Sequence, residues 1–379
     1  MILLSAMLGA LFLYLLQNYI YRKYWNKNLS VELSFSADKA VEGEELVLYE
    51  TVLNKKLLPL PILKVKFKTS KYLSFQNMNN SNITDHYYRN DLLSVMMYQK
   101  FTRALPFLCS RRGYYTIHNT DAVCSDLFLT FEAVTTFDTD IHLYVYPKPV
   151  DYDSFQAPFK MMLGTVLTKR FINEDPFEFR GIREYQTYDT LKAVNWKASA
   201  KTGALKVNVN DYTSSQKVII YLNLEPDTIW KHEDLEEESI RLAASLSLAF
   251  TAQGIPTSLH TNGRDILTHE TLHVPAGSGI SHINTFNEVL ARIDTTLEVP
   301  AFVPAFGEKC RQTGEHDYVV IISFYQKDDL AQLLKTLSES GTDFSWIIPV
   351  SKEVTVTAPE ELMPYIIPWE SERGELFES

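Results

Sequence analysis

Cysteine is scarce in this chain of 379 residues, which contains only Cys109, Cys124 and Cys310. The three are odd in number and form no Cys-x-x-Cys pair, which argues against a disulfide framework and against a cysteine-based zinc site. We therefore predict three buried, reduced thiols, as in a protein of the cytosol.

Motifs of catalysis are also missing. The sequence has no Gly-x-x-x-x-Gly-Lys-Ser/Thr phosphate loop and no Gly-x-Ser-x-Gly nucleophile elbow. Positive charge is in deficit, because 36 Lys and Arg residues stand against 47 Asp and Glu residues, for a net charge of −11. Nucleic acids attract charge of the opposite sign. We predict no enzymatic activity, no cofactor and no nucleic-acid partner.

The first 21 residues contain no charge, and the run from Ile2 to Leu16 is almost purely apolar. About 20 such residues in a helix span the hydrocarbon core of a bilayer. A basic cluster follows, consisting of Arg22, Lys23 and Lys27. Since positive charge stays in the cytoplasm, we predict a transmembrane anchor over residues 1–21, a single pass through the cell membrane and cytoplasmic soluble domains. The alternative is a cleaved signal peptide, which normally has a basic start and a small-residue cleavage site.

Residues 29–147 have the pattern of short β-strands. Val31, Leu33 and Phe35 alternate with polar residues, the period of a half-buried strand. Turn signals separate several such segments, and this predicts a β-sandwich domain.

The pattern changes to α/β over residues 212–352. Val218–Leu222 and Tyr318–Ile322 are continuous apolar runs, typical of parallel strands buried on both faces. Helical segments alternate with them, which predicts a Rossmann-like parallel sheet. One helix begins with Glu236, Glu237 and Glu238, which we interpret as a solvated helix start. Residues 353–379 are predicted to be a C-terminal tail.

Residues 148–211 are interpreted as a connector that contains a distinctive stretch. Asp189 is placed to cap a helix from about Thr190 to Thr202, with Gly203 at its end. Basic residues gather around this helix: Arg180, Arg183, Lys192, Lys197 and Lys201. They predict either a binding surface for an acidic partner or solvated lysines on a helix anchored by a buried Trp196.

This stretch resembles the hallmark of the domain-of-unknown-function family 58. The matching positions are Arg183, Tyr185, Asp189, Trp196, Lys197, Ala200, Gly203 and Leu205. There are departures from the pattern: Tyr188 replaces a glycine, Lys192 and Lys201 replace arginines, and Asn195 stands where histidine is common. Lysine lacks the bidentate geometry of arginine, so these changes weaken a bidentate contact.

The resemblance covers nearly the whole chain. It implies a membrane segment, a β-rich domain and then a domain similar to the von Willebrand factor A fold, although members often carry two membrane helices. It also implies a partner of the MoxR-type AAA+ ATPase class and a role in assembly or maturation of another protein. The residues that the resemblance assigns to partner binding are Arg183, Tyr185, Asp189, Lys192, Trp196, Lys197 and Gly203. It leaves the oligomeric state open.

Two segments carry metal signals. The von Willebrand A fold commonly binds Mg²⁺ through Asp-x-Ser-x-Ser after its first strand, and here the equivalent residues are Asn223, Glu225 and Asp227. We expect this degenerate site to bind no metal. His269-Glu270-Thr271-Leu272-His273 matches the His-Glu-x-x-His zinc motif, which requires a helix. Pro275 and the strand-like alternation of this segment argue against one.

Three functions follow as hypotheses. The first is a membrane-tethered, non-enzymatic adaptor or scaffold that binds protein partners. The alternative is a zinc-dependent hydrolase that uses His269, Glu270 and His273, with His282 or Glu288 as a third ligand. A third possibility is envelope assembly with the β-sandwich as the binding module.

Overall fold

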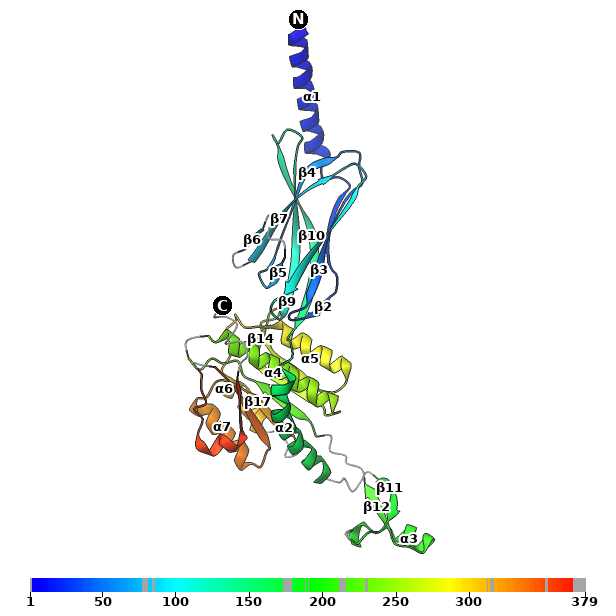
Figure 1. Cartoon of the computed structure of the whole chain (residues 1–379), viewed down its shortest axis with the longest axis vertical. Helices are drawn as coiled ribbons and strands as arrows, with labels where there is room; N and C mark the ends of the chain where they lie inside the picture. Colours follow the sequence, from blue (N-terminus) through cyan, green and yellow to red (C-terminus); the bar gives the residue numbers. More distant parts are fainter. Residues whose placement is uncertain are drawn as a thin grey trace. The chain divides into compact units, whose positions relative to one another are not determined.

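The computed structural model describes residues 2–76, 81–83, 86–172, 179–187, 189, 191–210, 216–228, 231–311, 313, 317–351 and 354–370. The chain forms two compact units, Met1–Lys148 and Pro149–Ser379 (Figure 1).

The first unit begins with helix α1 (Ile2–Tyr24), and within it Leu3–Tyr24 is long and apolar enough to cross a membrane. Among the described residues, no other helix meets that criterion. The last turn of α1 is fixed to the domain that follows, because Tyr21 and Trp25 are buried in its core. The Tyr21 hydroxyl also donates to the carbonyl of Pro59 at 2.9 Å.

Two sheets make up the rest of this unit, and they confirm the predicted β-sandwich. One has the strand order β1-β3-β8-β5 and the other β2-β10-β9-β4-β7-β6. Their bounds are β1 Leu29–Phe35, β2 Lys39–Val41, β3 Glu45–Asn54, β4 Leu60–Ser70, β5 Leu73–Phe75, β6 Ser81–Ile83, β7 His86–Val95, β8 Lys100–Cys109, β9 Gly113–Ser125 and β10 Glu132–Tyr146. The side chains that alternate inward, such as Leu33, Leu48 and Phe107, form the core between the sheets.

The second unit contains a sheet of order β15-β14-β13-β17-β18-β19, with β16 paired to β14. Its strands are β13 Val218–Leu222, β14 Thr257–Asp265, β15 Thr271–Gly277, β16 Ile293–Asp294, β17 Tyr318–Ile322, β18 Phe344–Val350 and β19 Ile366–Glu370. Strands β14, β13, β17, β18 and β19 run parallel, while β15 is antiparallel to β14. Counted along the chain without β16, the order is 3-2-1-4-5-6, that of a doubly wound α/β fold. The predicted parallel α/β domain is therefore confirmed.

Helices cover both faces of this sheet (Figure 1). On one face, α2 (Tyr152–Ile172), α4 (Glu233–Ala252) and α5 (Ile280–Arg292) pack on alternate residues such as Ile220 and Val320. On the other, α6 (Phe302–Arg311) and α7 (Asp328–Glu339) pack on the intervening residues, such as Ile219 and Val319. Coverage of both faces explains why every residue of β13 and β17 is buried.

Three sequence-based interpretations of this unit need correction. The segment interpreted as a connector contains the long helix α2, whose Met162 and Val166 lie in the core. The C-terminal tail does not begin at residue 353, because the 3-10 helix η2 (Glu360–Tyr365) and β19 follow and β19 pairs with β18. Residues 371–379 of that tail lie outside the described residues.

The third correction concerns the glutamates of α4. Glu236, Glu237 and Glu238 are 1–4% exposed, not solvated. Glu238 accepts a hydrogen bond of 2.8 Å from the indole of Trp369, which belongs to β19. Arg241 lies 3.8 Å from the other oxygen of Glu238. Glu238 is thus in contact with a strand that the sequence did not predict.

Candidate functional site

The family-like stretch forms a small module, which we call the hallmark module and define as the described residues between 179 and 210. Strand β11 (Phe179–Glu184) pairs antiparallel with β12 (Lys206–Asn210). Between them lie the 3-10 helix η1 (Leu191–Ala193) and the short helix α3 (Trp196–Thr202). Val194 and Val207, 6% and 1% exposed, pair with each other and form the buried centre of the module.

Asp189 has a different role from the predicted one. Its two oxygens accept hydrogen bonds of 2.6 and 2.5 Å from the two terminal nitrogens of Arg183, and one of them accepts the backbone N–H of Gln186 at 2.7 Å. Bonding to Arg183 holds the pKa of the Asp189 carboxyl below its usual value. Asp189 therefore closes the loop after β11 and caps no helix. Tyr188 and Thr190, which flank it, lie outside the described residues.

Asn195 is the residue that caps α3. Its Oδ1 accepts the N–H of Ala198 at 2.9 Å, and its Nδ2 donates to Oδ1 of Asn208 at 2.7 Å. The predicted helix from Thr190 to Thr202 is thus shorter and starts at Trp196. Gly203 ends it, as predicted, with a left-handed φ of 71° that only glycine adopts without strain.

The outer surface of the module is apolar and basic. Four large apolar side chains are exposed: Leu191 by 67%, Trp196 by 65%, Ile182 by 46% and Leu205 by 44%. Lys192, Lys197 and Lys201 are exposed as well. Tyr185 is half-buried, and its N–H donates to the carbonyl of Leu205. Trp196 is therefore not a buried anchor of the helix. It is exposed, as is Lys197, the next residue in the sequence.

The degenerate metal position lies at the carboxyl end of β13, where doubly wound sheets bind ligands. Asn223 is fully buried, donates to the hydroxyl of Ser323 at 3.0 Å, and accepts from the N–H of Glu225 and the amide of Asn262. Glu225 in turn accepts the N–H of Phe302 at 2.7 Å. The side chains of Asn223 and Glu225 thus link the carboxyl end of β13 to Ser323, Asn262 and Phe302.

Asp227 belongs to a neighbouring acidic group. Burial, followed by the hydrogen bond to Asp329, raises the pKa of Tyr325, and the carboxylates of Glu225 and Asp227 contribute to the shift. A pocket of about 520 Å³ opens beside them, lined in part by Glu225, Lys231 and Thr295–Val299. Among the described residues, no group of three His, Cys, Asp or Glu side chains is arranged to hold a metal ion.

The His-Glu-x-x-His segment crosses a β-hairpin between β14 and β15. His269 lies in the turn with φ 58°, and its N–H donates to the carbonyl of Asp265. His273 lies in β15 opposite His260, whose pKa burial lowers to about 4. The zinc motif needs both histidines on one face of a helix, and no helix underlies this segment.

Comparison with protein families identifies the region that contains the hallmark module. Residues 181–348 match the family described as "Protein of unknown function DUF58". Residues 181–348 are a DUF58 region. The match runs from within β11 to within β18 and thus includes nearly all of the hallmark module and most of the parallel sheet. No curated protein matches the chain.

Solved structures similar to this chain resemble it only weakly. The CARDB domain of the PF1109 protein from Pyrococcus furiosus, crystallised in complex with di-metal ions, is 16% identical; the match covers 31% of this chain and 86% of that one, with a TM-score of 0.21. Domains D2 and D3 of the major pilin SpaD from Corynebacterium diphtheriae are 10% identical, with coverages of 30% and 52% and a TM-score of 0.23.

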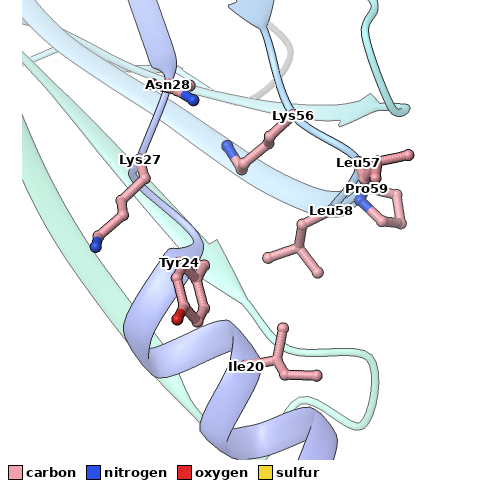
Figure 2. Close-up of a pocket in the computed structure, with 8 residues that line it drawn as sticks. All are labelled: Ile20, Tyr24, Lys27, Asn28, Lys56, Leu57, Leu58 and Pro59. Atoms are coloured by element: carbon pink, nitrogen blue, oxygen red, sulfur yellow. The ribbon is translucent and has the colours of Figure 1, made fainter.

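A pocket that the sequence did not predict lies outside the DUF58 region, where α1 enters the sandwich (Figure 2). It has a volume of about 560 Å³. The lining residues are Ile20, Tyr24, Lys27, Asn28, Lys56, Leu57, Leu58 and Pro59. No sequence motif indicates it, because its two walls are about 30 residues apart and meet only when α1 packs against the loop after β3.

Proposed function

We propose that this protein is a membrane-tethered, non-enzymatic adaptor that presents the hallmark module of its DUF58 region to a protein partner. The observation that carries the proposal is the surface of the module, where Trp196 is 65% exposed and Lys192 and Lys197 are exposed as well. Tryptophan that stands out of a rigid module is a frequent anchor of protein interfaces.

The interior of the module supports a binding role for this surface. The bonds of Asp189 and Asn195 fix the loop and the helix start, so the exposed side chains stand on an ordered frame. Ordering in advance lowers the entropic cost of association. We therefore assign Arg183, Asp189 and Gly203 to the frame of the module, and Lys192, Trp196 and Lys197 to the contact surface. Tyr185 lies between the two groups.

The partner that we propose is a MoxR-type AAA+ ATPase, as the family resemblance implies, in the assembly or maturation of another protein. The exposed lysines favour a partner with an acidic patch around an apolar cleft. The opposing hypothesis, a zinc-dependent hydrolase at His269, Glu270 and His273, gains no support from a hairpin turn.

Affinity capture of the tagged full-length protein from crosslinked membranes tests the partner proposal. We expect Trp196→Ala to remove an AAA+ ATPase from the captured proteins. Leu248→Ala is the matched control, because Leu248 is also exposed, by 45%, but lies on α4. Capture of the ATPase that is equal for both variants contradicts the proposed surface.

The membrane tether is proposed on α1, whose side chains from Leu3 to Leu16 are mostly exposed in the structure. Exposed apolar surface of this length is stable only in lipid or against another apolar surface. Two measurements test it. Alkaline extraction should leave the protein in the membrane, and the intact mass should include residues 1–24. A mature protein that lacks these residues identifies a cleaved signal sequence instead.

A further inference from the structure

Lys56 places an ammonium group inside the pocket at the end of α1 (Figure 2). Its Nζ is buried and has no hydrogen-bond partner among the described residues. Burial lowers the pKa of Lys56 to about 8. A buried ammonium without partners is costly, and an anion that reaches it recovers much of that cost.

The lining of the pocket suits an anion that carries an apolar part. Lys27 and Asn28 add an ammonium and an amide, and none of the lining residues is acidic. The remaining wall is apolar, formed by Ile20, Tyr24, Leu57, Leu58 and Pro59. Cationic and amide donors that line a pocket with an apolar wall match a phosphate esterified to glycerol better than a free inorganic ion.

The contacts of α1 show at which level of the candidate membrane span this pocket lies. The β9–β10 loop lies along the helix: Asp126 accepts a hydrogen bond of 2.8 Å from Gln17, and the rings of Phe128 and Tyr14 are 6.0 Å apart. Tyr14 lies ten residues before Tyr24, about 15 Å along the helix axis. The loop therefore reaches well into the candidate span Leu3–Tyr24.

The β9–β10 loop exposes the apolar side chains expected of a segment in contact with lipid. Leu127, Phe128 and Leu129 are 54%, 61% and 66% exposed, an unusual exposure for three successive large apolar residues. The loop rises beside α1 at the end of the sandwich where the helix enters (Figure 1). When α1 crosses a bilayer, the loop touches lipid, and the pocket below it lies at the depth of the headgroups.

We propose that this pocket binds the phosphate of an anionic phospholipid headgroup, with Lys56 as the central donor and Lys27 and Asn28 beside it. This inference rests on the proposed membrane tether. The apolar wall at Ile20 and Leu58 would contact the glycerol end of the lipid, while the β9–β10 loop dips into the same leaflet.

Native mass spectrometry of the full-length protein, purified in mild detergent with added phosphatidylglycerol, tests the proposal. We expect Lys56→Met to reduce the retained phosphatidylglycerol by about tenfold, the scale of one lost charge-assisted bond. Lys55→Met is the matched control and should retain lipid like the unchanged protein, because Lys55 is exposed and does not line the pocket. Lys56→Arg should restore most of the retention.

Thermal unfolding and alkaline extraction serve as controls for the lipid measurement. Lys56→Met should unfold at the same temperature as the unchanged protein or higher, since it removes a buried charge without a partner, so loss of lipid is not loss of fold. Equal retention in all variants overturns the proposal, as does equal binding of inorganic phosphate and phosphatidylglycerol. Alkaline extraction reports on the tether separately: a protein that leaves the membrane but still shows Lys56-dependent binding contradicts the tether alone.

Discussion

Arg183 and Asp189 form a two-pronged ion pair in which both terminal nitrogens of the guanidinium donate to the carboxylate, at 2.6 and 2.5 Å. The pair spans the loop between β11 and η1 and brings the carboxylate under the N–H of Gln186. Two parallel bonds fix direction as well as distance. The ion pair therefore fixes the orientation of the chain between β11 and the exposed face of the hallmark module.

We expect Asp189→Asn to loosen this loop without unfolding the α/β domain. The amide of Gln186 loses a charged acceptor, so its hydrogen exchange should accelerate by at least several-fold, while the amides of β13 and β17 remain protected. The same loss of protection, measured relative to the intrinsic exchange rate at each pH, should occur in the unchanged protein in acid. The pKa of Asp189 is lowered, so its contribution is present above the usual carboxyl pKa and is lost as pH falls through the lower, folded value. Unchanged exchange at Gln186 would show that the ion pair does not order the loop.

Asn195→Ala should destabilise α3, because it removes both the helix cap and the bond to Asn208. Caps of this type contribute about 1 kcal/mol, so we expect local exchange at Ala198 to rise by roughly fivefold. Asn195→Asp keeps the acceptor for the Ala198 amide and is the matched control. If the two variants exchange at the same rate, the cap does not stabilise the helix.

Glu50 should make the β-sandwich less stable as pH rises. Its carboxyl is fully buried beside Asp91, which is paired with Arg89 and Arg103, and burial raises its pKa from 4.5 to about 8. A raised pKa gives stability that is complete below the usual value and lost as pH rises through the folded value. Between pH 5 and pH 8 the loss is on the order of 3 kcal/mol.

Glu50→Gln keeps the neutral shape and should remove most of that dependence. The measurement is the unfolding transition of the sandwich in the full-length protein, followed at pH 5 and pH 8. Parallel curves for the two proteins would mean that Glu50 does not titrate in this range.

The three thiols should resist alkylation in the folded protein. Cys109, Cys124 and Cys310 are free and at most 2% exposed, and burial raises the pKa of each to about 12. Since only the thiolate reacts, a maleimide should label no thiol at pH 7.5 and all three after denaturation. Fast labelling of the native protein would contradict this burial.

The sequence predicted the features that depend on continuous patterns. The apolar runs of β13 and β17 predicted buried parallel strands, and the alternation at Val31, Leu33 and Phe35 predicted β1. Predictions from the sequence were wrong where a contact with a residue outside the local pattern determines the structure. Asp189 looked like a helix cap, but Arg183 takes both of its oxygens, so the helix begins only after Asn195.

The other errors also have tertiary causes. β19 is a short segment in which Pro368 separates Ile366 and Ile367 from Trp369, and only its pairing with β18 makes it a strand. Because that strand carries Trp369, the burial of Glu238 could not be predicted either. α2 contains Pro158 and has little helical periodicity, although Met162 and Val166 pack in the core. The pocket around Lys56 joins segments far apart in the sequence and has no local signal.

The most direct test of the proposed adaptor function is site-specific photocrosslinking in intact cells. A photoreactive aromatic residue replaces Trp196 in one variant of the full-length protein and Leu248 in another, and the adducts are identified by mass spectrometry. The account predicts an adduct with an AAA+ ATPase of the MoxR type from position 196 and none from position 248. No adduct at 196, or the same adducts at both positions, would contradict the hallmark module as the partner surface.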